Sequence, residues 1–225
     1  PSGRCRISVW DDLPFSEDDL PVTVQIKGAR VRAWQGIPDI TVDSADQLSV
    51  LEAPPWDEGM DLSNHSVEVS LGEVVAGPSR VGIKTSGMLV SVREDSGFIR
   101  RCTECRRVLR DGACFEHGAN EGTEDIRCRL VVDDEGVTAA VLVNKEASLQ
   151  ILNMTVDEMH SQVDELGESG FVQRIRETML GRRLSVSGRS IVDDQGAMVL
   201  ADDVDVMEHD AQMRASELRV QWGWA

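Results

Sequence analysis

Several residue types and patterns are scarce in this chain of 225 residues. Tyrosine is absent, and aromatic residues make up only 4% of the sequence. Any aromatic side chain at a binding surface must therefore be one of five tryptophans or four phenylalanines. No run of about 18 apolar residues occurs, so we expect no membrane-spanning helix. No segment has the pattern of a signal peptide, and we expect a soluble protein of the cell interior, with a cytoplasmic location.

Positive charge is also scarce. The chain has 23 lysines and arginines against 40 acidic residues, which gives a net charge of −17. This acidity argues against a protein that coats duplex DNA or anionic membranes by bulk charge, although a local basic patch remains possible. A hydrophobic content of 41% is enough to bury a core, so disorder of the whole chain is excluded.

The first part of the chain has the sequence pattern of β-strands. Alternating or β-branched runs occupy residues 5–10, 22–26, 29–34 and 37–42, with turn residues between them. So few strands cannot close a barrel, so we interpret residues 1–53 as the C-terminal half of a barrel that begins upstream. The start at Pro1 without a methionine fits a fragment of a longer polypeptide. Two prolines followed by charge and glycine predict a linker over residues 54–65.

Residues 66–208 are predicted to form the second unit. Strand patterns occur at 66–75, 80–92, 126–132, 137–143, 184–188 and 197–201, and an insert interrupts them at 98–120. Thr155 to Glu158 has the form of a capping box, and helical spacing continues to Met179 with a break expected at Gly170. The order of elements predicts a mainly β protein with an OB-fold barrel, a Greek-key arrangement of five strands plus a helix. An amphipathic helix or tail is expected over 209–225, packed on its own domain or on a partner.

The insert contains a metal-binding pattern. Cys102 and Cys105 form one short-spaced pair, and Cys114 and His117 form a second pair after eight residues. Four sulfur and nitrogen donors in two such pairs suit tetrahedral Zn²⁺. The ligand set leaves no open position for an activated water, so the expected role of the zinc is structural. Five cysteines, an odd number with three in this cluster, fit a metal site better than a disulfide framework.

Positive charge is concentrated in the first part of the same insert. Residues 98–110 hold five arginines against one acid, a net of +4, which leaves −21 for the rest of the chain. Guanidinium groups match phosphate oxygens, so this segment is a candidate site for a nucleic-acid backbone. The alternative is that these arginines pair with neighbouring carboxylates on a solvated face. No nucleophile with a neighbouring base can be placed, and we expect a protein that is not an enzyme.

Residues Gly97 to Gly118 resemble the zinc-bearing OB domain of archaeal replication protein A, a single-stranded DNA-binding protein. Residues 125–129 and 132–136, the helix near Thr155 and Leu180–Gly181 fall where that family has its second strand, next turn, helix and fourth strand. Residues 7–12 and 31–36 are similar to the third and fourth strands of a preceding OB fold. The resemblance covers nearly the whole chain and is weakest after Glu208.

This resemblance implies binding of single-stranded DNA in replication, repair and recombination. Other replication protein A subunits or repair proteins are expected partners, through the C-terminal segment. The implied phosphate contacts are Arg100, Arg101, Arg106, Arg107, Arg127 and Arg129, and the implied stacking faces are Phe98, Trp10 and Trp34. Aromatic residues of a barrel also serve as core. Two other functions remain open, a zinc-stabilised assembly module of a larger complex and an OB domain that binds RNA.

Overall fold

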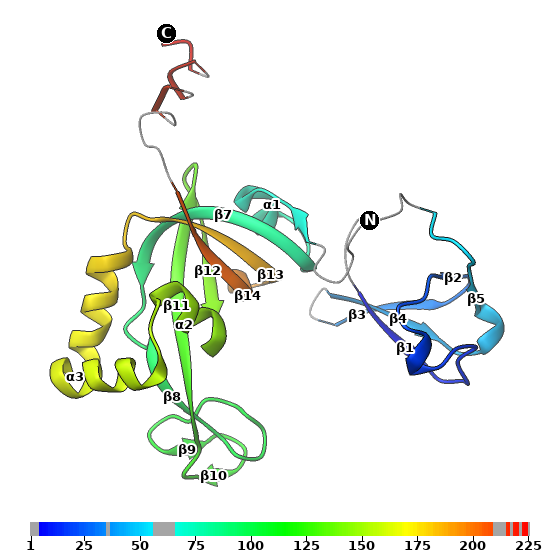
Figure 1. The fold of residues 1–225 in the computed structure, drawn as a ribbon, viewed down its shortest axis with the longest axis horizontal. Coiled ribbons are helices and arrows are strands. Elements are labelled where there is room, and N and C mark those ends of the chain that lie inside the picture. The colour runs from blue at the N-terminus through cyan, green and yellow to red at the C-terminus, as the bar shows by residue number, and fades with distance from the viewer. Residues whose placement is uncertain are drawn as a thin grey trace.

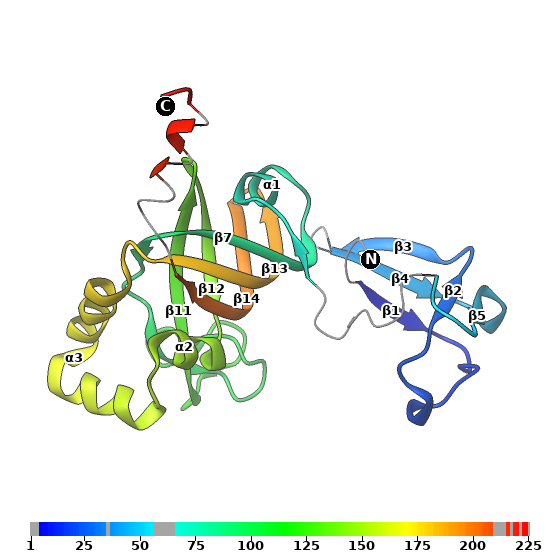
Figure 2. The ribbon, with the colours of Figure 1, turned by 45° about the horizontal axis from the view of Figure 1, so that its top comes forward.

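The computed structural model describes residues 5–34, 37–55, 66–208, 215–216, 218–220 and 222–224. Figures 1 and 2 show a barrel built from the second part of the chain and a smaller group of strands formed by the first part. Among the described residues, no helix is long and apolar enough to cross a membrane. The barrel strands are β7 (Arg80–Val92), β11 (Thr123–Asp134), β12 (Val137–Val143), β13 (Arg183–Asp193) and β14 (Gly196–Met207).

These five strands close into an OB barrel. β11 pairs antiparallel with both β7 and β12, and β13 pairs antiparallel with both β14 and β7. The closure depends on β12 and β14, which run parallel to each other. The order along the barrel is therefore first, second, third, fifth and fourth strand, with α3 (Val156–Met179) between the third and the fourth. The predicted fold class is confirmed, and the insert lies between the first two strands as expected.

The barrel interior is filled by alternate residues of each strand. On β11, Ile126, Cys128, Leu130 and Val132 are buried, whereas the residues between them are at least partly exposed. The strands β7, β12, β13 and β14 contribute further aliphatic residues, and Phe171 of α3 packs into the same core. This pattern follows from the period of two along a strand, which sends successive side chains to opposite faces. Cys128 is one of these core residues.

The helical elements differ in part from the prediction. The strand expected at 66–75 was wrong beyond β6 (Val67–Glu68), because Leu71–Ala76 forms the helix α1. Ser70 and Glu73 cap it in a capping box, and Leu71 and Val74 are buried on its inner face. A second short helix, α2 (Lys145–Leu152), was not predicted. The capping box of α3 at Thr155 is present, but the helix breaks at Gly167, at a φ of 72°, and not at Gly170.

The first part of the chain forms small sheets. β1 (Arg6–Val9) runs parallel to β4 (Ile37–Val42), and β4 pairs antiparallel with β3 (Arg30–Trp34). This repeats the pairing of β12, β14 and β13 in the barrel, which is the arrangement a half barrel has. β2 (Val24–Ile26) pairs with β5 (Leu48–Val50), a strand that was not predicted, and the turns η1 (Glu17–Asp19) and η2 (Ala45–Gln47) are 3-10 helices.

The division of the chain into domains stays a prediction. Most of the expected linker, residues 56–65, lies outside the described residues, and so do residues 209–214 of the expected C-terminal helix. Within the tail, residues 215–216 and 218–220 are helical.

Candidate metal centre and nucleic-acid interface

The metal loop, defined here as residues 102–120, extends from the end of the barrel beyond β8 (Gly97–Arg101) (Figure 1). It contains the short antiparallel pair β9 (Ala113–Cys114) and β10 (Gly118–Ala119). Two backbone hydrogen bonds of 2.8 Å anchor its first half, from Leu109 N–H to the Arg100 carbonyl and from Cys102 N–H to the Arg107 carbonyl. The insert predicted over residues 98–120 begins within the strand β8, and β8 pairs with β11.

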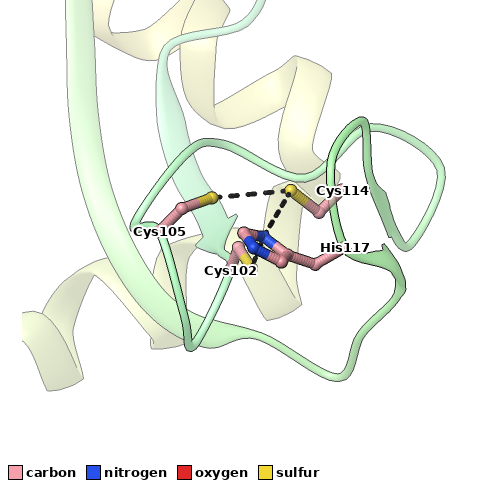
Figure 3. Close-up of side chains that lie close together, drawn as sticks. All are labelled: Cys102, Cys105, Cys114 and His117. Carbon is pink, nitrogen blue, oxygen red and sulfur yellow. Dashed lines mark hydrogen bonds between the residues drawn. The ribbon is translucent and has the colours of Figure 1, made fainter.

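The four predicted ligands converge inside this loop (Figure 3). Their ligand atoms all lie within 4.8 Å of one another. Nδ1 of His117 lies 3.6 Å from Sγ of Cys102 and of Cys114, and the Sγ atoms of Cys105 and Cys114 are also 3.6 Å apart. A tetrahedral zinc with Zn–S bonds of about 2.3 Å has edges of roughly 3.5 to 3.8 Å between its ligand atoms. The donor set and its spacing therefore fit a zinc ion held by these four residues.

Backbone N–H groups favour the thiolate forms of two ligands. The N–H groups of Glu116 and His117 lower the pKa of the Cys114 thiol to about 6. The N–H group of Cys105 lowers the pKa of the Cys102 thiol in the same way. Thiolates are the form that binds metal, so the turns of the loop prepare both sulfur atoms for coordination.

The pKa of the Cys105 thiol is affected by the two sulfur atoms that lie close to it. The N–H group of Arg107 lowers its pKa, but desolvation and the thiols of Cys114 and Cys102 outweigh this and raise the pKa overall. Three thiolates at such short range repel one another unless a cation lies between them. A divalent metal removes the conflict, because a coordinated thiol is deprotonated outright.

Two further side chains support the ligands from outside. Nε2 of His117 faces a carboxylate oxygen of Glu104 at 3.7 Å, while Nδ1 faces the sulfur atoms. The amide group of Asn120 lies 3.7 Å from Sγ of Cys102, and its oxygen accepts a 2.9 Å hydrogen bond from Gly122 N–H. Such contacts orient metal ligands. Neither Glu104 nor Asn120 was predicted, since their spacing from the ligands forms no motif.

The six predicted phosphate contacts do not share one face. β8 pairs with β11 so that Arg101 lies opposite Thr123, Arg100 opposite Glu124, and Arg127 opposite Gly97. Because paired residues lie on the same side of a sheet and successive residues alternate, Arg101, Arg127 and Arg129 lie on one side and Arg100 on the other. Arg106 and Arg107 lie in the metal loop.

Most of these arginines have partners within the protein. Arg101 pairs with Asp125 and Arg107 with Glu116. Arg127 and Arg129 share one oxygen of Asp95, at 2.9 and 2.7 Å. The remaining two donate to uncharged oxygens, Arg100 to the carbonyl of Glu121 and Arg106 to the hydroxyl of Thr123. Four of the six arginines thus pair with carboxylates of the protein, which is the alternative that the sequence left open.

A cleft of about 760 Å³ lies between β8, the metal loop and α3. Its apolar wall includes Phe98, Ile99, Leu109 and Phe171. Its charged residues are four arginines and four acids, Arg100, Arg110, Arg127, Arg129, Glu94, Asp95, Asp111 and Glu168. The cleft is therefore balanced in charge within a chain that is strongly acidic overall.

Arg127 is unusual among the residues that line this cleft. Its side chain is 15% exposed, and burial lowers its pKa. Among the described residues, its Nε atom is one of three buried side-chain nitrogen or oxygen atoms without a hydrogen-bond partner. A buried donor without an acceptor costs about 1–3 kcal/mol. Because this Nε atom is itself buried, Arg127 presents its guanidinium to the cleft through Nη2, which pairs with Asp95.

The predicted stacking residues have different surroundings. The Phe98 ring stacks on the imidazole of His160 of α3, with ring centroids 4.2 Å apart, and it packs against the core. This favours the core alternative for Phe98. Trp10 follows β1 and is 78% exposed. Trp34 ends β3, and its side chain lies outside what the structure describes.

The metal loop also carries an exposed aromatic residue that was not predicted. Phe115 lies between Cys114 and His117 in the metal loop and is 99% exposed. Its position within a four-residue turn between two ligands was a usable signal, because so short a turn has no core in which to bury a ring.

Comparison with known proteins gives similarity to solved structures only. No family model and no curated protein matches the chain. A chain of a replication protein A heterotrimer bound to single-stranded DNA is 14% identical with a TM-score of 0.47, over 92% of this chain. This chain spans 56% of the length of that one.

Two further structures show a weaker likeness. Yeast RPA bound to single-stranded DNA is 13% identical with a TM-score of 0.39, over 62% of this chain and 85% of that one. The second OB-fold domain of replication protein A from Methanococcus maripaludis is 11% identical with a TM-score of 0.31, over 57% and 85%. All three structures are of replication protein A, and similarity at this level carries no argument about function.

Proposed function

We propose that this protein binds single-stranded DNA through its OB barrel and metal loop, without catalysing a reaction. The observation that supports this most is the cleft beside the metal loop, which four arginines line: Arg100, Arg110, Arg127 and Arg129. OB folds bind oligonucleotides on the face of their second and third strands and on the loop between the first and second. In this protein that face belongs to β11 and β12, and that loop is the metal loop.

Zinc has a structural role in this proposal. Cys102, Cys105, Cys114 and His117 lie close enough together to bind one ion. Together they would fill the four positions of a tetrahedral zinc and leave none for a reacting water. The ion would hold the loop in one shape, because residues 102–120 contribute nothing to the hydrophobic core of the barrel. A fixed loop keeps Arg110 in place at the cleft.

The biological setting we infer is DNA replication, repair and recombination, where single strands are exposed. Partner subunits or repair proteins would dock on the C-terminal segment. There Trp222 and Trp224 form an edge-to-face pair with centroids 5.1 Å apart, and both are more than half exposed. Exposed tryptophans are enriched at protein interfaces.

A second candidate is a zinc-stabilised assembly module. It is favoured by the ion pairs of Arg101, Arg107, Arg127 and Arg129, which already satisfy the groups that DNA would need. An OB domain that binds RNA is a third candidate, since nothing in the cleft separates ribose from deoxyribose.

The test is a fluorescence anisotropy titration of labelled oligothymidine with the full, zinc-loaded chain, at low and at molar salt. Unlabelled duplex DNA and RNA serve as competitors. Saturable binding that only single-stranded DNA displaces supports the proposal, and displacement by RNA supports the third candidate. No binding at either salt favours the assembly module.

Charge reversal then locates the contact. Arg129→Glu is expected to weaken binding and to lower the salt dependence, because each lost phosphate contact reduces the slope by about one. Arg174→Glu, an exposed arginine of α3 that does not line the cleft, is the matched control. The quadruple replacement of Arg100, Arg101, Arg106 and Arg107 by glutamate tests the metal-loop side in the same way. Unchanged binding by both variants would remove the proposed contact site.

A further inference from the structure

The metal loop holds an aromatic ring out in solvent. Phe115 is 99% exposed, the highest value among the exposed large hydrophobic residues. An exposed phenylalanine forgoes the hydrophobic stabilisation that burial would give, so a position that exposes the whole ring without a contact is unusual. The other two phenylalanines of the second unit, Phe98 and Phe171, are packed against the core.

The backbone around Phe115 is held on both sides. Cys114 and His117 are two of the four candidate metal ligands, and the N–H groups of Glu116 and His117 point at the Cys114 sulfur. β9 and β10 pair across the turn, with Cys114 opposite Gly118. The ring therefore cannot fold back into a core, and little backbone entropy is lost when it meets a ligand.

The residues beside Phe115 suit a nucleotide. Glu116, the next residue, pairs with Arg107, whose side chain is 58% exposed. Exposed ion pairs contribute little to stability, so this guanidinium can exchange its carboxylate for a phosphate at low cost. An aromatic face with an arginine next to it is the combination that holds a base and its backbone.

The sheet face provides no such ring. Between Arg129 and Asp133, the outward residue of β11 is Val131, and its partner on β12 is Ala140. β11 and β12, both fully described, contain no aromatic residue at all. If bases stack on the second unit, the ring must come from outside these strands.

We propose that Phe115 is a base-stacking residue for single-stranded DNA, presented by the zinc-held turn and paired with Arg107 as its phosphate contact. This proposal rests on the proposed function and adds a named stacking position to it. Zinc would then also support base stacking, because loss of the metal would release the ring from its position.

Three variants of the full, zinc-loaded chain test the role of the ring. Phe115→Ala removes the ring, Phe115→Leu keeps apolar volume without a π face, and Phe115→Trp keeps the aromatic face. Zinc content and thermal unfolding of each variant verify the fold, which a fully exposed residue should leave unchanged. The measured quantity is the affinity for oligothymidine and for the same oligomer with abasic positions introduced one at a time.

Stacking predicts that both Phe115→Ala and Phe115→Leu weaken binding on the order of tenfold, and that Phe115→Trp restores it. One abasic position should weaken binding by the wild type but have little further effect on Phe115→Ala, because the contact is already lost. Equal affinity of wild type and Phe115→Ala would overturn the stacking role and leave DNA binding intact, which points to a protein pocket for the ring. A wild type that binds no DNA would overturn both this inference and the proposed function.

Discussion

The carboxylate of Asp95 lies 2.7 Å from Nη1 of Arg129 on the outer side of the β8–β11 sheet. The same oxygen accepts a 2.9 Å hydrogen bond from Nη2 of Arg127. Burial raises the pKa of Asp95, but the hydrogen bond and charge of Arg129, with the charge of Arg127, outweigh it and hold the pKa below its usual value. An anionic oxygen between two guanidinium groups has the position of a phosphate oxygen, so Asp95 competes with DNA for both arginines.

Removal of this competitor should strengthen DNA binding. We expect Asp95→Asn to bind oligothymidine several-fold more tightly than wild type, with a steeper salt dependence, because two more guanidinium groups become available. Anisotropy titrations at several salt concentrations measure both quantities. Glu94→Gln is the matched control, since it removes the same charge at a residue of the cleft that forms no ion pair within the described part of the chain. Equal gains in the two variants would assign the effect to net charge alone.

Asp125 predicts a pH-dependent contribution to stability. Desolvation raises its pKa, but Arg101 and the N–H group of Ile126 outweigh it and lower the pKa. A carboxylate with a depressed native pKa stabilises the fold above its unfolded pKa of about 3.9, and the contribution disappears as the pH falls through the native pKa. The difference in melting temperature between wild type and Asp125→Asn should therefore be constant from neutral pH to about 5 and shrink below about 4.

Thermal unfolding of both proteins between neutral pH and pH 3 measures this difference. Comparison at each pH cancels the loss of metal, which affects both proteins. Asp164→Asn, at an exposed position of α3, controls for the loss of one negative charge. A difference that stays constant into acid would mean that the Arg101–Asp125 pair contributes no net stability.

Removal of the metal should unfold the loop and spare the barrel. Zinc binding contributes about 10–16 kcal/mol to folding in small zinc peptides, and the metal loop has no other core. The barrel core consists of residues outside the loop. We expect Cys114→Ala to lose the bound metal, to lose the ordered NMR signals of residues 102–120 and to keep those of β11 to β14. Cys5→Ser, at an exposed cysteine outside the site, should keep one metal per chain. Global unfolding of Cys114→Ala would show that the loop supports the barrel as well.

Two glycines should respond to alanine with opposite signs. A Cβ atom at Gly188 would lie 2.1 Å from the Leu200 carbonyl oxygen, at the irregularity where β13 meets β14. We expect Gly188→Ala to destabilise the protein by about 1–3 kcal/mol or more, because the two strands must separate. Gly72 of α1 has only the Ser70 hydroxyl at 3.9 Å, so Gly72→Ala should stabilise by about 0.5–1 kcal/mol through helix propensity. Urea unfolding of both variants measures the two changes, and a neutral Gly188→Ala would contradict the close approach.

Local patterns in the sequence were enough for the barrel strands, the start of α3 and the cluster of four candidate metal ligands, but not for α1, α2 or β5. Alternation of apolar residues predicted the barrel strands, and a capping box predicted the start of α3, since both depend on neighbours a few positions apart. The same holds for Cys102, Cys105, Cys114 and His117, whose short spacing allows each pair to wrap one turn around a metal. Where two local signals competed, as at Ser70 to Ala76, the capping box and buried i, i+3 pair prevailed over alternation.

The distribution of the arginines was decided by the tertiary structure. The sequence showed a basic segment, but the register of β8 against β11 placed Arg100 and Arg101 on opposite sides, and the fold brought Asp95 to Arg127 and Arg129 from more than thirty positions away. Composition and spacing therefore determined the barrel strands, the cluster of candidate metal ligands and the acidic composition with its basic segment. Strand register and chain closure decided which charges form pairs. They also decided that His160 covers the ring of Phe98 and that the ring of Phe115 stays exposed. These outcomes depend on contacts between residues that are distant in the chain.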